Sequence, residues 1–423
     1  MNMESKELIS ELAAKAKSAS RSLLSASPEE RSSALGAIAS SLVTHSEEIL
    51  AANAMDLSAA SKTGAPSSMI DRLLLTAGRV KEMADSVLQV AALPDPLGRI
   101  IAERTLANGL HLKQVSVPFG VVGMVYEGRP NVTVDAASIL LKSGNTSLLR
   151  GSVSAVHSNE VLVKIMREAL SKGSISPDVI QLVPSFDRTT VTALLHARGE
   201  VDLLIPRGSA DLIRTVIDNS TVPTIETGAG VCHVYVDEFA DLDKALPILI
   251  NSKTDRPSVC NAAETLLVHE QVVKKFMPAA LKALKNAGVV IHGDAKTLKI
   301  AAALNIEVKL AQVENWSTEY NALEINVAIV PNLLAAAEHI QKYGTQHTEA
   351  IVTESEERAN QFIALADCAA IMVNASTRFT DGEQMGFGAE IGISNQKLHA
   401  RGPMGLEQMT TTTWIVRGNG QIR

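Results

Sequence analysis

Short apolar runs alternate with longer stretches of helical spacing from residue 120 to near the end of the chain. Strands separated by helices in this way predict parallel, doubly wound sheets, and therefore an α/β protein. The pattern restarts near residue 237, so we expect two such units. The expected strands are 121–125, 147–149, 179–183, 201–205 and 231–236 in the first unit, and 265–269, 289–291, 326–330, 349–353 and 369–373 in the second.

The first ninety residues show only the helical pattern. Apolar positions from Leu8 to Leu23 share one helix face, and a second helix is expected over residues 28–49. Its start is marked by Ser27, a favoured N-cap residue, followed by a proline and by an acid three residues further on. A third helix is expected around residues 80–90 and ends before Pro94.

A hairpin follows these helices. Residues 99–106 and 110–117 form strand-like runs around Asn108-Gly109, a pair that suits a tight primed turn. Residues 411–416 predict one more strand in the tail. Because exposed ribbon edges are often covered by another chain, we expect 99–117 and 401–423 to be oligomerisation elements of a homodimer or homotetramer.

The length of 423 residues exceeds the roughly 250–300 residues that one core supports. We therefore expect a first domain of residues 1–236, rejoined by about 367–400, and a second domain of residues 237–366. A net charge of −7 argues against nucleic acid or an anionic membrane as a partner. No apolar run reaches the ~18–20 residues of a membrane span, and the start lacks the layout of a signal peptide.

Cysteine is used sparingly. Three widely spaced cysteines fit neither a disulfide framework nor a metal site, so we expect a cytoplasmic protein without a metal. Cys232 and Cys368 lie among apolar or small residues, as buried free cysteines usually do. Cys260 instead lies in a polar turn between a helical stretch and a strand-like run. Arg256, four residues earlier, would favour its thiolate form.

The predicted sheets suggest a nucleotide, yet no strand is followed by a G-x-G-x-x-G or Walker-type sequence. Gly208-Ser209 follows a strand and opens a helix, where backbone N–H groups can hold a phosphate. A Gly-Ser pair at such a position is more often only a helix cap.

Several separated motifs together resemble the aldehyde dehydrogenase superfamily. The segment from Phe119 to Arg150, the Gly208-Ser209 turn, Glu226-Thr227-Gly228 and Cys260 occur in that family's order. The later segments 342–351, 388–394 and 397–406 are very similar to the γ-glutamyl phosphate reductase family within it. The resemblance covers nearly the whole chain. It implies an aldehyde dehydrogenase-like α/β fold with two doubly wound Rossmann-like domains and a small oligomerisation hairpin and tail.

That resemblance implies a reaction, the NADPH-dependent reduction of L-glutamyl 5-phosphate to L-glutamate 5-semialdehyde in proline biosynthesis. Cys260 would be the nucleophile that forms a thioester. The Asn131 side chain and the Cys260 backbone N–H would stabilise the oxyanion. Taken from the residues alone, Asn131 is more readily a turn-forming residue after Pro130 than an oxyanion donor.

Further roles follow from the resemblance. Glu226 matches the base that activates water elsewhere in the superfamily. Activated water would hydrolyse the thioester before hydride could reduce it. We therefore expect the Glu226 carboxylate to be turned away from the thioester or to orient a neighbouring residue. Residues 150–153 match the superfamily's Lys-Pro-Ser-Glu, whose Glu tends to exclude a 2′-phosphate. Here that acid is absent, while the cation of Arg150 and the hydroxyl of Ser152 remain, which favours NADP. The cofactor-binding residues expected are Arg150, Ser152, Gly208, Ser209, Gly228 and Glu319.

The substrate carries a carboxylate and a phosphate, which arginines bind well. The substrate-binding residues expected are Arg256, Arg129, His347, Arg378 and Arg401. Glutamate 5-kinase is a possible partner, because acyl phosphates hydrolyse readily. Two alternatives stay open at this stage: an acyl-coenzyme A-reducing enzyme of the same superfamily, and a non-catalytic dinucleotide-binding scaffold.

Overall fold

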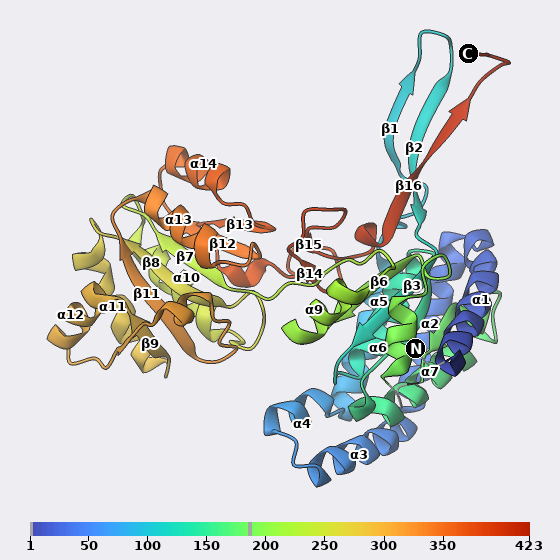
Figure 1. The fold of residues 1–423 in the computed structure, drawn as a ribbon, viewed down its shortest axis with the longest axis horizontal. Coiled ribbons are helices and arrows are strands. Elements are labelled where there is room, and N and C mark those ends of the chain that lie inside the picture. Colours follow the sequence, from blue (N-terminus) through green and yellow to red (C-terminus); the bar gives the residue numbers. More distant parts are fainter. Residues whose placement is uncertain (1–2, 185–187) are drawn as a thin grey trace. The chain divides into compact units, whose positions relative to one another are not determined.

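The computed structural model describes residues 3–184 and 188–423, which form two compact units (Figure 1). Unit 1 comprises Met1–Thr227, Gly386–Gly392 and Met404–Arg423, and unit 2 comprises Gly228–Met385 and Ile393–Pro403. Each unit contains one parallel sheet with helices on both sides, as the alternating pattern predicts.

Unit 1 is built on a four-stranded parallel sheet in the order β5-β4-β3-β6. Its strands are β3 (Val121–Tyr126), β4 (Thr146–Arg150), β5 (Ile180–Leu182) and β6 (Leu203–Arg207). The chain starts in β3, moves outward through β4 and β5, and then returns to the other side of β3 with β6. Ligands in open α/β sheets bind at the carboxyl ends of the strands where the order reverses, here β3 and β6.

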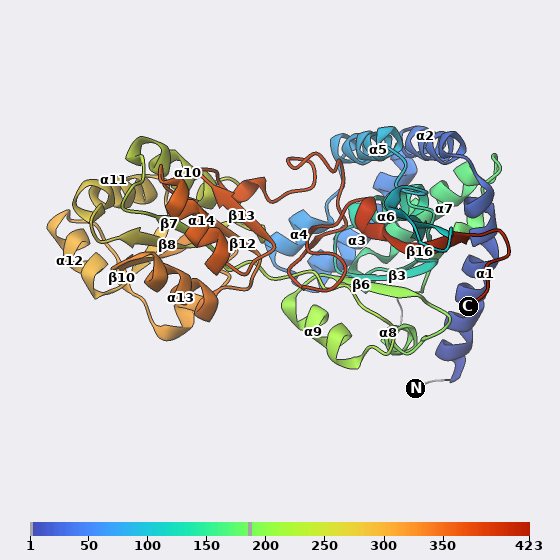
Figure 2. The same cartoon turned by 90° about the horizontal axis from the view of Figure 1, so that it is seen from above.

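The helices of unit 1 cover both faces of that sheet, and Figure 2 shows α8 and α9 on one side and α5 and α2 on the other. They are α1 (Met3–Ser25), α2 (Pro28–Thr44), α3 (Ser46–Lys62), α4 (Ser67–Leu73), α5 (Ala77–Ala92), α6 (Asn131–Lys142), α7 (Val156–Leu170), α8 (Thr189–Leu195) and α9 (Ala210–Asn219). Ile9, Ala13 and Ala16 of α1 pack against Val121 and Val125 of β3, which forms the core on that face.

The helix expected over residues 28–49 is two helices, so that prediction is wrong in one respect. Ser27 caps α2 with a full capping box, as expected, but the chain leaves helical geometry at His45. Glu47 and Glu48 lie in the first turn of α3, where the helix dipole stabilises carboxylates. Leu42 and Ile49 are seven residues apart, a spacing that a continuous helix and two successive helices both satisfy.

A three-stranded antiparallel ribbon belongs to unit 1 and consists of β1 (Ile100–Thr105), β2 (His111–Pro118) and β16 (Thr410–Arg417). The predicted hairpin and tail strand are thereby confirmed, and the tail pairs along β2 of its own chain. Ile100, Ile101, Trp414 and Val416 are exposed on this ribbon. Its outer strands β1 and β16 each pair on one side only among the described residues.

Unit 2 is built on a seven-stranded parallel sheet in the order β10-β9-β11-β8-β7-β12-β13. Its strands are β7 (Cys232–Val236), β8 (Ala263–His269), β9 (Val290–Gly293), β10 (Lys309–Leu310), β11 (Glu324–Val330), β12 (Thr348–Val352) and β13 (Ala370–Val373), and a separate pair is β14 (Ile393–Ser394) and β15 (Gly402–Pro403). Its α-helices are α10 (Leu242–Thr254), α11 (Val273–Asn286), α12 (Ala295–Ala303), α13 (Leu333–Tyr343) and α14 (Glu356–Leu365), and a 3-10 helix η4 covers Thr377–Phe379. Aliphatic side chains of the central strands and of α10 and α11 form the largest core of the unit.

The expected domain boundaries need two corrections. β7 pairs with β8 and β12, so the strand at 232–236 belongs to unit 2 rather than closing the first domain. β13 pairs with β12, so the strand expected to rejoin the first domain stays in the second sheet. Residues 386–392 and 404–423 return to unit 1 instead.

Candidate active site

Cys260 lies in the loop of residues 255–262, between the end of α10 and the start of β8. This confirms the predicted turn between a helix and a strand. The thiol is partly exposed. Because β7 and β8 are parallel neighbours, the segments that precede them meet at the amino edge of the sheet, and the Cys260 loop contacts Cys232 at the start of β7. Arg256 in this loop has a positive φ of 59°, a left-handed conformation that costs energy for a residue with a side chain.

Gly230 lets the backbone pass directly against the Cys260 loop. A Cβ on Gly230 would lie 1.4 Å from the Cys260 carbonyl oxygen and 2.4 Å from its carbonyl carbon. The Gly230 backbone N–H donates to Glu319 Oε1 at 2.9 Å, so this carboxylate holds the segment that packs against the nucleophile loop. On the same side, Cys232 Sγ donates to the Cys260 carbonyl oxygen at 3.2 Å. Burial raises the pKa of Cys232 well above its usual value, which keeps that thiol protonated as a donor.

Arg378 of η4 braces both ends of the Cys260 loop. Its Nη1 donates to the buried Asn261 Oδ1, and its Nε lies 3.4 Å from Asp255 Oδ2. Asn261 Nδ2 in turn donates to the Thr380 carbonyl oxygen at 2.8 Å. The structure therefore places Arg378 against the Cys260 loop, and its expected contact with the substrate stays a prediction. Arg256 is exposed, and no hydrogen bond or ion pair of its side chain is formed with the described residues.

A buried ion pair closes the same loop at its base. Lys253 Nζ, at the end of α10, lies 2.7 Å from Glu264 Oε2 at the start of β8. Their side chains are 0% and 1% exposed. Burial lowers the pKa of Lys253 and raises that of Glu264, because each charge is withdrawn from water. The pair joins the residues on either side of the loop and limits its movement.

His347 is buried, with 0% of the residue exposed, and its expected role in substrate binding stays a prediction. Its Nδ1 lies 2.8 Å from Thr348 Oγ1 and 3.8 Å from Cys232 Sγ. Burial lowers the pKa of His347 to about 4, so the ring is neutral at neutral pH. The residue supports the segment behind Cys260.

The remaining predicted residues of unit 2 have identifiable contacts. Arg401 Nη2 lies 2.9 Å from Asp367 Oδ1, and Lys397 lies 2.6 Å from the other oxygen of the same carboxylate. The backbone N–H of Gly228 donates to the Ile393 carbonyl oxygen at 3.0 Å. A Cβ on Gly228 would meet the Asn395 side chain at 2.3 Å, so this glycine is required for packing. Burial raises the pKa of Cys368 to about 12, which fits an unreactive thiol.

In unit 1, the Gly208-Ser209 turn follows β6 at the point where the strand order reverses. The Ser209 backbone N–H donates to Glu127 Oε2 and its hydroxyl donates to Glu127 Oε1, both at 2.8 Å. Glu127 directly follows β3, and a Cβ on Gly208 would lie 2.7 Å from its carboxylate. The helix start expected to hold a phosphate thus holds a carboxylate of the same chain, in keeping with the positive end of a helix dipole.

The cation expected beside the cofactor is buried. Arg150 ends β4 and is only 7% exposed, and its Nη1 donates to the Gly151 carbonyl oxygen at 2.8 Å. Ser152 is partly exposed and caps the short helix that follows, because its Oγ accepts the Ser154 backbone N–H.

Asn131 is the first residue of α6, and its side chain is partly buried. Its Nδ2 donates to Asp135 Oδ2, one helical turn later, at 2.9 Å. Burial raises the pKa of Asp135 to about 6. Arg129 and Glu226 are both partly exposed, and the Thr227 hydroxyl beside Glu226 donates to the Pro206 carbonyl oxygen at 3.0 Å.

The predicted site residues divide between the two units. Unit 2 holds Cys260, Arg256, His347, Arg378, Arg401, Gly228 and Glu319, and unit 1 holds Asn131, Arg129, Arg150, Ser152, Gly208, Ser209 and Glu226. Sequence reasoning missed Glu127, Asp135 and Gly230. Asp135 could have been found, because a donor and an acid four residues apart on a predicted helix face each other.

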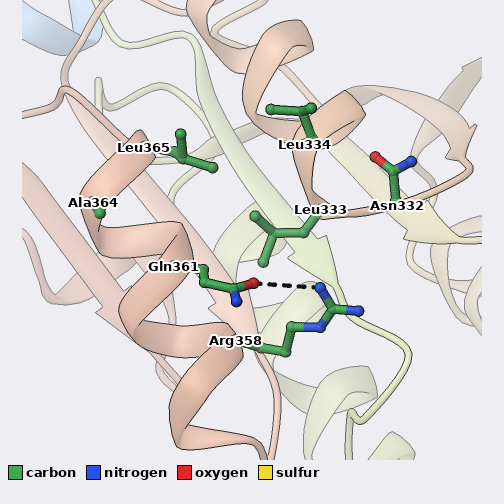
Figure 3. A pocket seen from close by; sticks show the side chains of 7 residues that line it. All are labelled: Asn332, Leu333, Leu334, Arg358, Gln361, Ala364 and Leu365. Carbon is green, nitrogen blue, oxygen red and sulfur yellow. Dashed lines mark hydrogen bonds between the residues drawn. The ribbon is translucent and has the colours of Figure 1, made fainter.

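Other parts of the structure do not add to this site. A surface pocket beside α13 and α14 is lined by leucines together with Asn332, Arg358 and Gln361, and it includes no candidate site residue (Figure 3). In the described part of the chain, no group of histidine, cysteine and acidic residues could hold a metal ion. None of the described helices is both long and apolar enough to cross a membrane.

Comparisons with known proteins agree with this fold. A model of the aldehyde dehydrogenase family matches residues 1–329. A γ-glutamyl phosphate reductase of Thermobifida fusca (strain YX) is 52% identical over 415 residues, which are 98% of this chain and 98% of that protein. The crystal structure of γ-glutamyl phosphate reductase from Thermotoga maritima is 44% identical, with a TM-score of 0.95 over 98% of this chain and 99% of that one. The corresponding enzyme structure from Saccharomyces cerevisiae is 29% identical, with a TM-score of 0.54 over 97% and 98% of the two chains.

Proposed function

The chain belongs to the aldehyde dehydrogenase family, and we propose that it reduces L-glutamyl 5-phosphate to L-glutamate 5-semialdehyde and phosphate with NADPH, the second step of proline biosynthesis. Relatives named for this activity match almost the full chain. The observation that carries the proposal is the Cys260 loop, where a partly exposed thiol is held between a buried ion pair, a buried asparagine and a glycine that admits no side chain.

The proposed chemistry uses Cys260 as the nucleophile. Its thiolate attacks the acyl carbon, and the bond from that carbon to the phosphate oxygen breaks. Phosphate departs, and the acyl group remains on Cys260 as a thioester. Hydride then adds to the thioester carbon, and the carbon–sulfur bond breaks to release the aldehyde and the thiolate. The Asn131 amide and the Cys260 backbone N–H stabilise the oxyanion in both steps, and one such donor is typically worth about 3–4 kcal/mol.

Membership of the family supports a nicotinamide dinucleotide as the source of that hydride. The residues of unit 1 fit its phosphate groups, because the Ser209 N–H and hydroxyl already hold a carboxylate. We propose that Gly208 and Ser209 receive a phosphate in place of Glu127. We propose that the Ser152 hydroxyl binds the 2′-phosphate of NADP. Arg150, a buried cation nearby, would contribute positive charge to the same site. We also propose that Gly228 and Glu319 bind the cofactor. The Glu319 carboxylate in addition accepts a hydrogen bond from the Gly230 N–H.

The substrate is proposed to be bound by arginines. Arg256 is the first choice, because it is exposed and lies in the Cys260 loop. Arg378 contacts the same loop through Asn261. It therefore positions the loop and also provides a positive charge for an anionic group of the substrate. Arg129 and Arg401 are further candidates for the anionic groups.

Glu226 is proposed to orient a neighbour rather than to activate water. Its neighbour Thr227 is buried and fixed to the Pro206 carbonyl oxygen, which ties this segment to the end of β6. A base that activates water would hydrolyse the thioester before reduction. A Glu226→Gln variant should therefore keep reductive activity within about tenfold, and a loss of several orders of magnitude would contradict this role.

We also propose that the ribbon of β1, β2 and β16 joins subunits of a homodimer or homotetramer. Its exposed Ile100, Ile101, Trp414 and Val416 and its two outer edges would be covered by another copy. Light scattering at the monomer mass would contradict this. Direct transfer of glutamyl phosphate from glutamate 5-kinase is a further hypothesis, which the absence of any association in a pull-down would weaken.

The proposed reaction is tested by supplying glutamate, ATP and a glutamate kinase and following NADPH oxidation. Wild-type protein should oxidise NADPH in proportion to added glutamate kinase, and Cys260→Ser should lose activity by at least about 10³-fold, because serine is a far weaker nucleophile. Mass spectrometry of mixtures without NADPH should find a glutamyl group on the Cys260 peptide. Activity with coenzyme A thioesters but not with glutamyl phosphate would point to the acyl-coenzyme A-reducing alternative.

A further inference from the structure

Asp135 and Asn131 form a pair at the start of α6, one helical turn apart. The Asn131 amide nitrogen lies 2.9 Å from an oxygen of the Asp135 carboxyl group. Residues four apart on a helix face each other, so the contact follows from the helix itself. Three elements provide partners to this carboxyl group: Asn131 on α6, the hydroxyl of Ser86 on α5, and the positive charge of Arg207 on β6.

An asparagine side chain has a donor end and an acceptor end of similar size. A neighbour that can only accept hydrogen bonds distinguishes the two ends. An ionised carboxylate is such a neighbour, because it has no proton to donate. With Asp135 ionised, the Asn131 amide nitrogen must face it, and the second N–H of that nitrogen is left to donate elsewhere.

On the basis of the proposed function, we infer that Asp135 is a positioning residue that holds the Asn131 amide with its N–H, rather than its carbonyl oxygen, toward the oxyanion of the reaction. Asp135 does not touch the substrate in this role. It excludes the flipped amide, which would present a carbonyl oxygen to a developing negative charge.

Protonation of Asp135 removes this selection, because a protonated carboxyl group can donate to the Asn131 carbonyl oxygen and accept the flipped side chain. Burial raises the pKa of Asp135 to about 6, and the charge of Arg207 and the hydrogen bonds from Asn131 and Ser86 act in the opposite direction. The ionised form is therefore the one that positions Asn131 at neutral pH, and the rate should fall as the pH drops through about 6.

The kinetic test is a double-mutant cycle on the full-length enzyme. Asn131→Ala should lower kcat by about 10²–10³-fold, the usual effect of losing one oxyanion donor. Asp135→Asn, which both donates and accepts, should lower kcat by about tenfold or more and leave the KM for NADPH within about twofold. In the double variant the Asp135→Asn change should cost nothing further, because the group it positions is gone. Costs that multiply would overturn the inference.

The pH profile separates positioning from a merely structural effect. The wild-type acid limb near pH 6 should be absent in Asp135→Asn. Asp85→Asn is the matched control, since Asp85 is an exposed acid that pairs with Lys81 four residues away, and it should leave both kcat and the profile unchanged. An acid limb that persists in Asp135→Asn would also overturn the inference. Thermal melting shows whether each variant is folded.

A second measurement does not depend on turnover. With asparagine labelled in ¹⁵N, the Asn131 side-chain NH₂ signals, assigned by their loss in Asn131→Ala, should shift with a midpoint near pH 6 in the wild-type protein and stay constant in Asp135→Asn. If the wild-type protein did not reduce glutamyl phosphate but this titration occurred, the proposed function would fail while the Asp135–Asn131 coupling stood. If the signals did not move, the coupling itself would be refuted.

Discussion

Gly230→Ala is the most direct perturbation of the nucleophile loop. The added Cβ would lie 1.4 Å from the Cys260 carbonyl oxygen, 2.4 Å from its carbonyl carbon and 2.9 Å from its Cα. All three are backbone atoms, so no change of side-chain rotamer can relieve the contact. The two segments must move apart.

The size of the movement follows from the same distances. Ordinary contacts of a Cβ begin near 3.4 Å, so the Gly230 segment and the Cys260 backbone must separate by about 2 Å. Overpacking of this kind costs about 1–3 kcal/mol of stability, and a displacement of about 1 Å at a reacting group can cost about 10²-fold in rate. We therefore expect Gly230→Ala to fold with reduced stability and to lose at least about 10²-fold in kcat.

Two assays check this expectation. NADPH oxidation in the kinase-coupled reaction reports kcat, and the rate of Cys260 alkylation by iodoacetamide reports the thiol alone. Gly36→Ala is the control, because a Cβ there meets no atom within 4 Å and the residue lies inside α2. Alanine should stabilise that helix by about 0.5–1 kcal/mol without affecting either rate. A Gly230→Ala enzyme with wild-type kcat and wild-type alkylation would refute the account of the loop.

Three further predictions concern other contacts. Glu127→Gln should bind NADPH about threefold to tenfold more tightly by calorimetry, since an exposed carboxylate at Ser209 competes with a phosphate, and weaker binding would make Glu127 part of the cofactor site. Lys253→Met leaves Glu264 buried without its cation and should lower the free energy of unfolding in urea by about 3–5 kcal/mol, with most of it restored by adding Glu264→Leu. His347 has a pKa of about 4 against an ordinary 6.5, so the native state binds fewer protons, and stability is lost as the pH falls below 6.5. The wild-type protein should lose about 2 kcal/mol more than His347→Asn between about pH 7 and 5, and equal losses would contradict the burial argument.

Local features of the sequence were sufficient to predict the strands and the turn that holds Cys260. Apolar runs of strand length, a helical stretch before residue 255 and polar residues around the cysteine are all visible without the fold. The partner of each strand is not visible in this way. The run at 369–373 looks like any other buried strand, and only its pairing with β12 assigns it to unit 2.

Burial of polar side chains was the least predictable property. Arg150 and His347 each stand in a motif that suggests contact with a ligand, yet they are 7% and 0% exposed. A cation or an imidazole at a strand end is expected to face solvent, because withdrawing it from water costs free energy. Part of that cost is met by the next residue in the chain, the Thr348 hydroxyl beside the His347 ring and the Gly151 carbonyl oxygen beside Arg150. The sequence does not show that the backbone conformation allows these contacts.

The glycines illustrate how far a sequence can be read. A glycine in a short polar segment indicates that a side chain would be in the way, but not what it would meet. Gly208 makes room for the carboxylate of Glu127, and Gly230 makes room for the backbone of Cys260. Gly208 and Glu127 are distant in sequence and come together because β3 and β6 are adjacent. Gly230 and Cys260 come together because β7 and β8 are adjacent. Substitutions at Gly208 and Gly230 should therefore act through different partners, the anion-binding turn and the nucleophile loop, although the sequence presents the two glycines alike.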